Sequence, residues 1–188
     1  MTTAQINVLK RNGRGKEPLN IDKIHSMVGY ATQDITGVSA SHVENSGIQF
    51  FDGINTDDIQ QILIKSANDL ISLESPNYQY VAARLLLFSL RKKLYHRLWE
   101  HPKFIDQIKT CIKQGVYDKD ILVQYTESEI DRMGMWIVHE RDYKFTYAGL
   151  RQVMDKYLVQ DRSTGDIYET PQFMLSLIHI SEPTRPSQ

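Results

Sequence analysis

The sequence has little of what marks several large protein classes. Cys111 is the single cysteine among 188 residues, which excludes an internal disulfide framework and a cysteine-rich zinc site. No apolar run reaches the roughly 18 residues that a membrane-spanning helix needs, and the first residues lack the basic and apolar stretches of a signal peptide. The 22 basic and 23 acidic residues nearly cancel, whereas general binders of nucleic acid or anionic membranes carry excess positive charge. We therefore expect a globular cytoplasmic protein without nucleic-acid or membrane partners.

The N-terminal residues predict a small antiparallel hairpin. Residues 6–9 and 17–19 have a strand pattern, and Gly13 and Gly15 in the connection tolerate positive φ. A single hairpin is marginally stable in water, so it must pack on other elements.

Four helices are predicted after the hairpin, up to about residue 95. Apolar residues recur at helical spacing over 24–31 in the first helix, and the second is predicted to end near Gly53. The fourth, 77–95, is apolar on nearly all sides at its centre, which is typical of a buried helix. Residues suited to capping the first three helices precede them: Asn20, Ser41 in a capping box with Glu44, and Thr56. The fourth helix ends with basic residues, whose charge suits the negative end of the helix dipole: Arg91, Lys92 and Lys93.

Residues 99–102 mark a boundary between this helical core and a second part. Beyond it the pattern predicts a helix over 104–115, a capping box at Thr126, a helix capped by Thr146, and a hairpin over 157–168. Neither internal repeats nor a low-complexity linker is present. The sequence therefore predicts a mainly α chain in two parts.

The densest basic cluster surrounds the first turn. Such residues beside a helix N-terminus, where free N–H groups also favour anions, form a candidate phosphate site; the alternative is a solvated basic turn. The sequence contains neither a Walker A motif nor a dinucleotide-binding fingerprint. The basic residues of the cluster are Lys10, Arg11, Arg14 and Lys16.

No catalytic or metal-binding constellation accompanies this cluster. The six histidines are scattered without a second ligand at metal-binding spacing, and Cys111 is predicted to be a small buried hydrophobic residue. The acidic residues Glu127, Glu129 and Asp131 are explained by helix capping and the helix dipole. From residue chemistry alone, this is a helical protein with one candidate anion site.

Several motifs in consistent order resemble a known family. The first two resemble the ATP-cone, the allosteric nucleotide-binding module at the N-terminus of many ribonucleotide reductases. The later ones resemble the large (alpha) subunit of class I ribonucleotide reductase, so that the resemblance covers residues 6 to about 174. The motifs are VLKRNG at 8–13, LNIDKI at 19–24, GINTDDI at 53–59, PNYQYVAARL at 76–85, KYLV at 156–159, TGDIYE at 164–169 and PQF at 171–173.

The resemblance implies a fold and a regulatory function. Residues 1–95 would form the ATP-cone, a four-helix bundle capped by a small β-sheet, and 96–174 the truncated start of the alpha subunit's helical domain. The effectors would be ATP, which activates, and dATP, which inhibits, bound with magnesium. The partners in the full enzyme would be a second alpha subunit and a small radical-bearing beta subunit.

The resemblance also implies a set of nucleotide-binding residues. Lys10 and Lys92 would contact phosphates, Thr56 would lie beside the base or sugar, and the loop and helix start that follow the hairpin would surround the nucleotide. The full set is Val8, Lys10, Arg11, Glu17, Pro18, Leu19, Asn20, Ile21, Asp22, Lys23, Thr56, Phe88 and Lys92.

The sequence departs from the family pattern at a few points. Gln60 and Ser89 stand where many relatives carry histidine, which affects the expected discrimination of dATP, and the loop at 14–16 is one residue longer. The family's catalytic cysteines and glutamate lie further along a longer chain, and Cys111 matches none of them. We therefore expect this chain to lack reductase activity by itself.

The last residues break the pattern. Residues 175–188 resemble a translated transposase adapter from sequencing libraries, and we expect them to be foreign to the gene. Because the second part would then lack its packing partners, exposed apolar surface is predicted there.

Two other functions compete with the reductase assignment. A stand-alone nucleotide-sensing regulator would resemble a zinc ribbon joined to a cone, and one cysteine cannot build that ribbon. A helical interaction module without a ligand predicts that removing Lys10 leaves nucleotide affinity unchanged.

Overall fold

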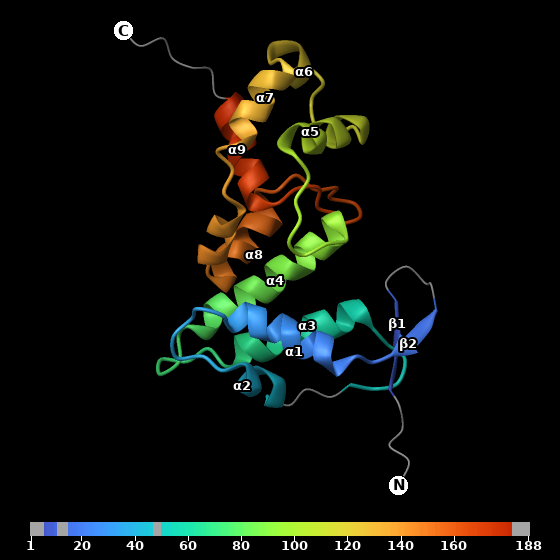
Figure 1. Ribbon diagram of the computed structural model, residues 1–188, viewed down its shortest axis with the longest axis vertical. Helices are drawn as coiled ribbons and strands as arrows, with labels where there is room; N and C mark the ends of the chain where they lie inside the picture. The colour runs from blue at the N-terminus through green and yellow to red at the C-terminus, as the bar shows by residue number, and fades with distance from the viewer. Residues whose placement is uncertain (1–5, 11–14, 47–49, 182–188) are drawn as a thin grey trace. The chain divides into compact units, whose positions relative to one another are not determined.

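The structure is a computed structural model that describes residues 6–10, 15–46 and 50–181 (Figure 1). The described residues are mainly helical with a three-stranded sheet, which confirms the predicted fold class. The chain divides into two compact units: unit 1 comprises 1–89 with 145–150, and unit 2 comprises 90–144 with 151–188. The domain limits proposed at 95 and 174 stay predictions. Over the described ranges no helix is long and apolar enough to cross a membrane.

The small sheet of unit 1 contains the predicted hairpin. Strand β1 (Asn7–Leu9) pairs antiparallel with β2 (Lys16–Pro18), and the sheet order is β2-β1-β3. The sequence pattern missed β3 (Ile54–Asn55), which pairs parallel with β1. A strand of two residues is too short to show the alternation that identifies strands, and only a partner far away in the sequence defines it.

Four helices from the first 95 residues contribute to unit 1. They are α1 (Ile21–Thr32), α2 (Ala40–Asn45), α3 (Thr56–Asp69) and α4 (Tyr78–Tyr95), of which the residues from Leu90 onward belong to unit 2. Helix α2 packs against both α1 and α3. The core includes Val28, Val43, Leu63 and Leu85, all fully buried; such burial stabilises by about 1.5–3 kcal/mol per side chain.

The predicted limits of α2 are wrong. The N-cap position is Ser39, and Ser41 lies inside the helix, so the predicted capping box with Glu44 is not formed. The hydroxyl of Ser41 instead lies 2.7 Å from that of Ser39. The helix also ends at Asn45 rather than near Gly53. Two serines close together offer alternative caps, and the sequence pattern cannot choose between them.

The predicted cap of α3 is wrong by one residue. Asn55 holds the N-cap position, and its side-chain oxygen accepts a hydrogen bond from the Asp58 backbone N–H at 2.7 Å. Thr56 is therefore the first helical residue. Asparagine caps helices at least as well as threonine, which explains the outcome.

Unit 2 is built from shorter helices. Their core contains Phe104, Ile108, Cys111, Ile130 and Phe173, so the prediction of a buried Cys111 is confirmed. The elements are α5 (Phe104–Lys113), α6 (Ile121–Gln124), α7 (Glu127–Gly134), the 3-10 helix η1 (His139–Lys144), α8 (Tyr147–Lys156), whose first residues count with unit 1, and α9 (Pro171–Ser181).

Two local predictions for the second part are confirmed, and three elements, α6, η1 and α9, were not predicted. Thr126 and Glu129 form the predicted capping box of α7, and the Thr146 hydroxyl accepts a hydrogen bond from the Gly149 N–H at 3.2 Å. Helix α9 was not predicted, because the sequence after residue 174 was expected to be foreign. In the structure it continues to Ser181, and Leu177 packs against the unit 2 core.

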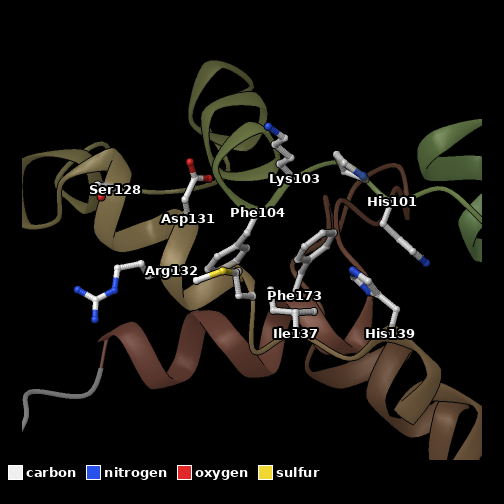
Figure 2. Close-up of a pocket in the computed structure, with 12 residues that line it drawn as sticks. His101, Lys103, Phe104, Ser128, Asp131, Arg132, Ile137, His139 and Phe173 are labelled. Atoms are coloured by element: carbon white, nitrogen blue, oxygen red, sulfur yellow. The ribbon is translucent and has the colours of Figure 1, made fainter.

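Two histidines of unit 2 stack on each other. The ring centroids of His101 and His139 lie 3.7 Å apart with an interplanar angle of 13° (Figure 2). Burial lowers the pKa of His101 to about 3, with His139 and Arg91 lowering it further. Burial, together with Arg91, lowers the pKa of His139 to about 4. Both rings are therefore neutral in the folded protein at neutral pH.

This pair predicts a loss of stability in mild acid. Unfolded histidines take up protons near pH 6.5, whereas the folded pair stays neutral down to about pH 4. Protons then bind the unfolded state preferentially, so the free energy of unfolding should fall as the pH drops from about 6.5 to 4. Unfolding can be followed by tryptophan fluorescence. As the pH drops from about 6.5 to 4, we expect the unfolding midpoint of the wild-type protein to fall more steeply than that of the double variant His101→Phe/His139→Phe.

Comparing the wild-type protein with the double histidine variant cancels the contribution of Asp142 to the pH dependence of stability. Burial raises the pKa of this carboxyl to about 6, which acts in the opposite direction, but it is present in both proteins. Equal pH slopes between pH 7 and 5 would show that the stacked histidines do not resist protonation.

Candidate functional site

The connection from β2 to α1 forms an open pocket of about 480 Å³. Its lining is the continuous segment that sequence analysis assigned to the nucleotide. The lining residues are Glu17, Pro18, Leu19, Asn20, Ile21, Asp22 and Lys23.

The start of α1 supplies backbone N–H donors beside this pocket. Asn20 is the N-cap, as predicted, and its side-chain oxygen accepts a hydrogen bond from the Lys23 backbone N–H at 3.0 Å. The first turn of a helix leaves backbone N–H groups without helical partners, and the dipole adds partial positive charge there. Lys23 adds one positive charge to the pocket lining, and the carboxylates of Glu17 and Asp22 add two negative charges. An anion at this helix start would therefore bind chiefly through the backbone N–H groups.

Loss of the cap should weaken this helix start measurably. We expect Asn20→Ala to lower the free energy of unfolding by about 1 kcal/mol, because an orphan N–H of α1 loses its acceptor. Asn20→Ser, which keeps an acceptor, should cost only a fraction of this. Urea unfolding followed by circular dichroism measures both variants, and equal losses would contradict a capping role for the side chain.

Lys10 and Glu17 form an ion pair beside the pocket. The Lys10 Nζ lies 2.7 Å from a Glu17 carboxylate oxygen, and the two side chains are 47% and 37% exposed. The hydrogen bond from Lys10 holds the pKa of the Glu17 carboxyl below its usual value, and the charge of Lys23 adds to this effect. An exposed pair of this kind contributes little to stability. It can therefore open when a more highly charged group approaches Lys10.

Two further predicted residues lie in or directly after the strands of the sheet. Val8 is buried in β1, paired with Glu17 on one side and with Ile54 of β3 on the other. Thr56 follows β3 directly and begins α3. Strand β3, which sequence reasoning missed, lies at the edge of the sheet opposite β2 and the loop that follows it, and neither Val8 nor Thr56 lines the pocket.

The remaining predicted residues are not brought into the pocket lining. Phe88 is 1% exposed within α4, and Lys92 lies in the last turn of that helix, in unit 2. Arg11 lies outside the described residues. The nucleotide-binding roles of these three residues, like those of all the other predicted residues, stay predictions.

Both positions that depart from the family pattern are buried. Gln60 is 3% exposed, and its side-chain amide donates a hydrogen bond to the Leu85 backbone oxygen at 3.0 Å. Ser89 is also 3% exposed. Gln60 therefore ties α3 to α4 through a neutral contact.

Comparison with known proteins settles the family of the first part. Residues 6–93 match the ATP cone domain family. The chain carries an ATP-cone domain. The matched segment contains β1, β2, β3 and α1 to α3, with all but the end of α4, so the pocket and the Lys10–Glu17 pair both lie within the cone.

The similarity continues beyond the cone. The chain is 47% identical over 172 residues to ribonucleoside-diphosphate reductase 1 subunit alpha from Salmonella typhimurium and from Escherichia coli, which is 91% of this chain and 22% of each relative. It is 43% identical over 182 residues to the ribonucleoside-diphosphate reductase alpha subunit of phage T4, 95% of this chain and 24% of that protein. The resemblance to the N-terminal region of reductase alpha subunits is thereby confirmed, and the chain spans less than a quarter of these relatives.

Proposed function

We propose that the cone binds ATP and dATP as allosteric effectors, and that the chain is the regulatory N-terminal part of a ribonucleoside-diphosphate reductase alpha subunit. The observation that carries the proposal is the pocket formed by 17–23 at the start of α1, with Lys10 beside it, inside a segment that matches the ATP cone domain. In the full enzyme the cone would activate deoxyribonucleotide synthesis with ATP bound and inhibit it with dATP bound.

The chemistry of the pocket supports this assignment. The triphosphate would lie over the N–H groups of the first turn of α1, with Lys10 and Lys23 balancing part of its charge. As Lys10 turns from Glu17 to the phosphates, the Glu17 carboxylate becomes available to accept a hydrogen bond from an amino group such as that of adenine. Magnesium bound to the phosphates would reduce the remaining repulsion from Asp22.

The partners belong to the complete enzyme. A second alpha subunit and a small radical-bearing beta subunit would assemble with the full-length protein in the cytoplasm, where this chain would supply the regulatory end. No ribonucleotide reduction is expected from the 188-residue protein itself, because it spans only 22% of the reductase subunits it resembles.

Calorimetric titration of the 188-residue protein tests the proposal. We expect saturable binding of ATP and of dATP in the presence of magnesium, and much weaker binding of inorganic triphosphate, which lacks the base. The ratio of the two nucleotide affinities measures discrimination with Gln60 in place. A folded protein that gives no binding heat and no thermal shift with either nucleotide would contradict the proposal and favour a ligand-free interaction module.

A further inference from the structure

The connection between α1 and α2 lies beside the beginning of α4 (Figure 1). Asn77, directly before α4, donates a hydrogen bond from its side-chain amide to the Thr36 backbone oxygen at 2.9 Å. The hydroxyl of Tyr78, the first residue of α4, accepts a hydrogen bond from the Ser39 backbone N–H at 3.1 Å. Polar side chains at the start of α4 therefore fix this connection at two points.

Arg84 of α4 makes a further contact of this kind, and it holds the end of α1 itself. Its guanidinium donates to the backbone oxygen of Gln33, the C-cap of α1, at 2.5 Å and to that of Ala31 at 3.4 Å. The last turn of α1 contains no basic residue, so Arg84 supplies the positive charge that suits the negative end of the helix dipole. The neighbours of Arg84 in α4, Ala83 and Leu85, are buried. This arginine in an apolar stretch of α4 thus serves the C-terminal end of α1.

The opposite end of α1 contributes three residues to the pocket lining. Ile21, Asp22 and Lys23 are exposed, and Ile24 is the first buried residue of the helix. Side-chain packing therefore contributes little to the direction of this first turn, which follows the axis of the rest of α1. That axis is set by the buried face of the helix and, at its far end, by Arg84.

The length of α1 allows its far end to influence the pocket. Its 12 residues, at 1.5 Å rise per residue, make a rod about 18 Å long. When such a rod turns about its buried middle, a shift of about 1 Å at the C-terminal end moves the first-turn N–H groups by a similar distance in the opposite direction. Hydrogen bonds weaken steeply when their distance and angle depart from the optimum. A change in the contacts of Arg84 would therefore weaken hydrogen bonds to an anion at the start of α1.

We propose that Arg84 is a positioning residue of the nucleotide site, which holds α1 so that the N–H groups of its first turn face the bound phosphates. The proposal rests on the proposed function and does not require Arg84 to touch the nucleotide. A purely structural role predicts a different result, because loss of Arg84 would then lower the stability of the protein and leave the ATP affinity of its folded state unchanged.

Two variants of the 188-residue protein test this role. Arg84→Met keeps an unbranched stem and removes both hydrogen bonds, whereas Arg84→Lys keeps the charge but loses the planar fork. In calorimetric titrations at a temperature at which the variants are folded, we expect ATP affinity to fall about tenfold in Arg84→Met and about threefold in Arg84→Lys. The control Ile64→Val removes a methyl group from a buried residue of α3. It should lower the melting temperature and leave ATP affinity unchanged.

Backbone amide NMR signals report the start of α1 without any nucleotide. We expect the signals of residues 20–24 to shift in both Arg84 variants and to keep their positions in Ile64→Val. If Arg84→Met fails to fold, Arg84→Lys decides the outcome by the same two measurements.

The results separate this proposal from the proposed function. A wild-type protein that binds neither ATP nor dATP contradicts the proposed function itself. If the wild-type protein binds ATP, the positioning role alone is overturned by a folded Arg84 variant with wild-type ATP affinity. It is equally overturned if the amide signals of residues 20–24 do not shift in either Arg84 variant.

Discussion

Replacing Lys10 with alanine should weaken ATP binding about 10- to 100-fold. A charge-assisted hydrogen bond contributes about 1.5–3 kcal/mol, and each 1.4 kcal/mol changes an affinity about tenfold. In the structure Lys10 already sits beside the pocket, but Glu17 holds its amino group at 2.7 Å. Because that pair is largely exposed, breaking it costs little free energy. Most of the free energy of the contact between Lys10 and the phosphates should therefore contribute to the measured affinity.

A matched control makes this experiment specific. Lys65 forms a similar ion pair with Asp69 at 2.7 Å on the exposed face of α3. Lys65→Ala removes the same charge at a distance from the pocket loop and should leave ATP affinity within about twofold of the wild-type value. If both lysine variants bind ATP as well as the wild-type protein does, Lys10 does not contact the phosphates and a site elsewhere replaces the present assignment.

A substitution at Glu17 should separate the contribution of the phosphates to binding from that of the base. Glu17→Gln removes the ion pair but keeps a carbonyl oxygen that can accept a hydrogen bond. We expect inorganic triphosphate to bind more tightly to this variant, because Lys10 is no longer held by a carboxylate. Titration of both proteins with inorganic triphosphate measures the difference, and unchanged binding would show that the ion pair does not compete with phosphate.

Local sequence patterns predicted the elements around the pocket, whereas the assignment of residues 17–23 to a nucleotide came from the family resemblance and stays a prediction. Residues 17–23 are continuous, the cap at Asn20 is a short-range signal, and the hairpin joins neighbouring strands. Similar short-range chemistry explains why the capping box at Thr126 was found. The sheet was incomplete for the opposite reason, since β3 is two residues long and pairs with a strand far away in the sequence.

The features of unit 2 depend on tertiary contacts that no local pattern carries. The stacking of His101 on His139 and that of Phe104 on Phe173 join residues from separate elements. Arg91 is the clearest case. Its position near the C-terminal end of α4 predicts only a cation that suits the helix dipole, and nothing in the local pattern shows that the side chain is buried, at 2% exposed. Its acceptors lie about fifty residues away.

Arg91→Ala should cause the largest loss of stability among these variants, about 3–5 kcal/mol. Its guanidinium donates to the Tyr143 hydroxyl at 2.9 Å and to the His139 backbone oxygen at 3.0 Å, and lies 3.6 Å from the Asp142 carboxylate. Asp142 is fully buried and otherwise accepts a hydrogen bond from Gln172 at 3.0 Å. Removing the arginine leaves this carboxylate buried without its counter-charge, which accounts for most of the loss.

The pH dependence of that loss identifies its cause. Burial already raises the pKa of Asp142 to about 6 despite the nearby arginine, and without Arg91 the pKa should rise further. The neutral acid needs no counter-charge, so the deficit of Arg91→Ala should be larger at pH 8 than at pH 5. Both tryptophans, Trp99 and Trp136, lie in unit 2, and urea unfolding followed by their fluorescence therefore reports this unit. Arg151→Ala, which breaks an exposed pair with Asp155, should cost at most about 1 kcal/mol at either pH. A deficit of Arg91→Ala that does not change with pH would assign the role of Arg91 to its hydrogen bonds with Tyr143 and His139 instead of to its charge.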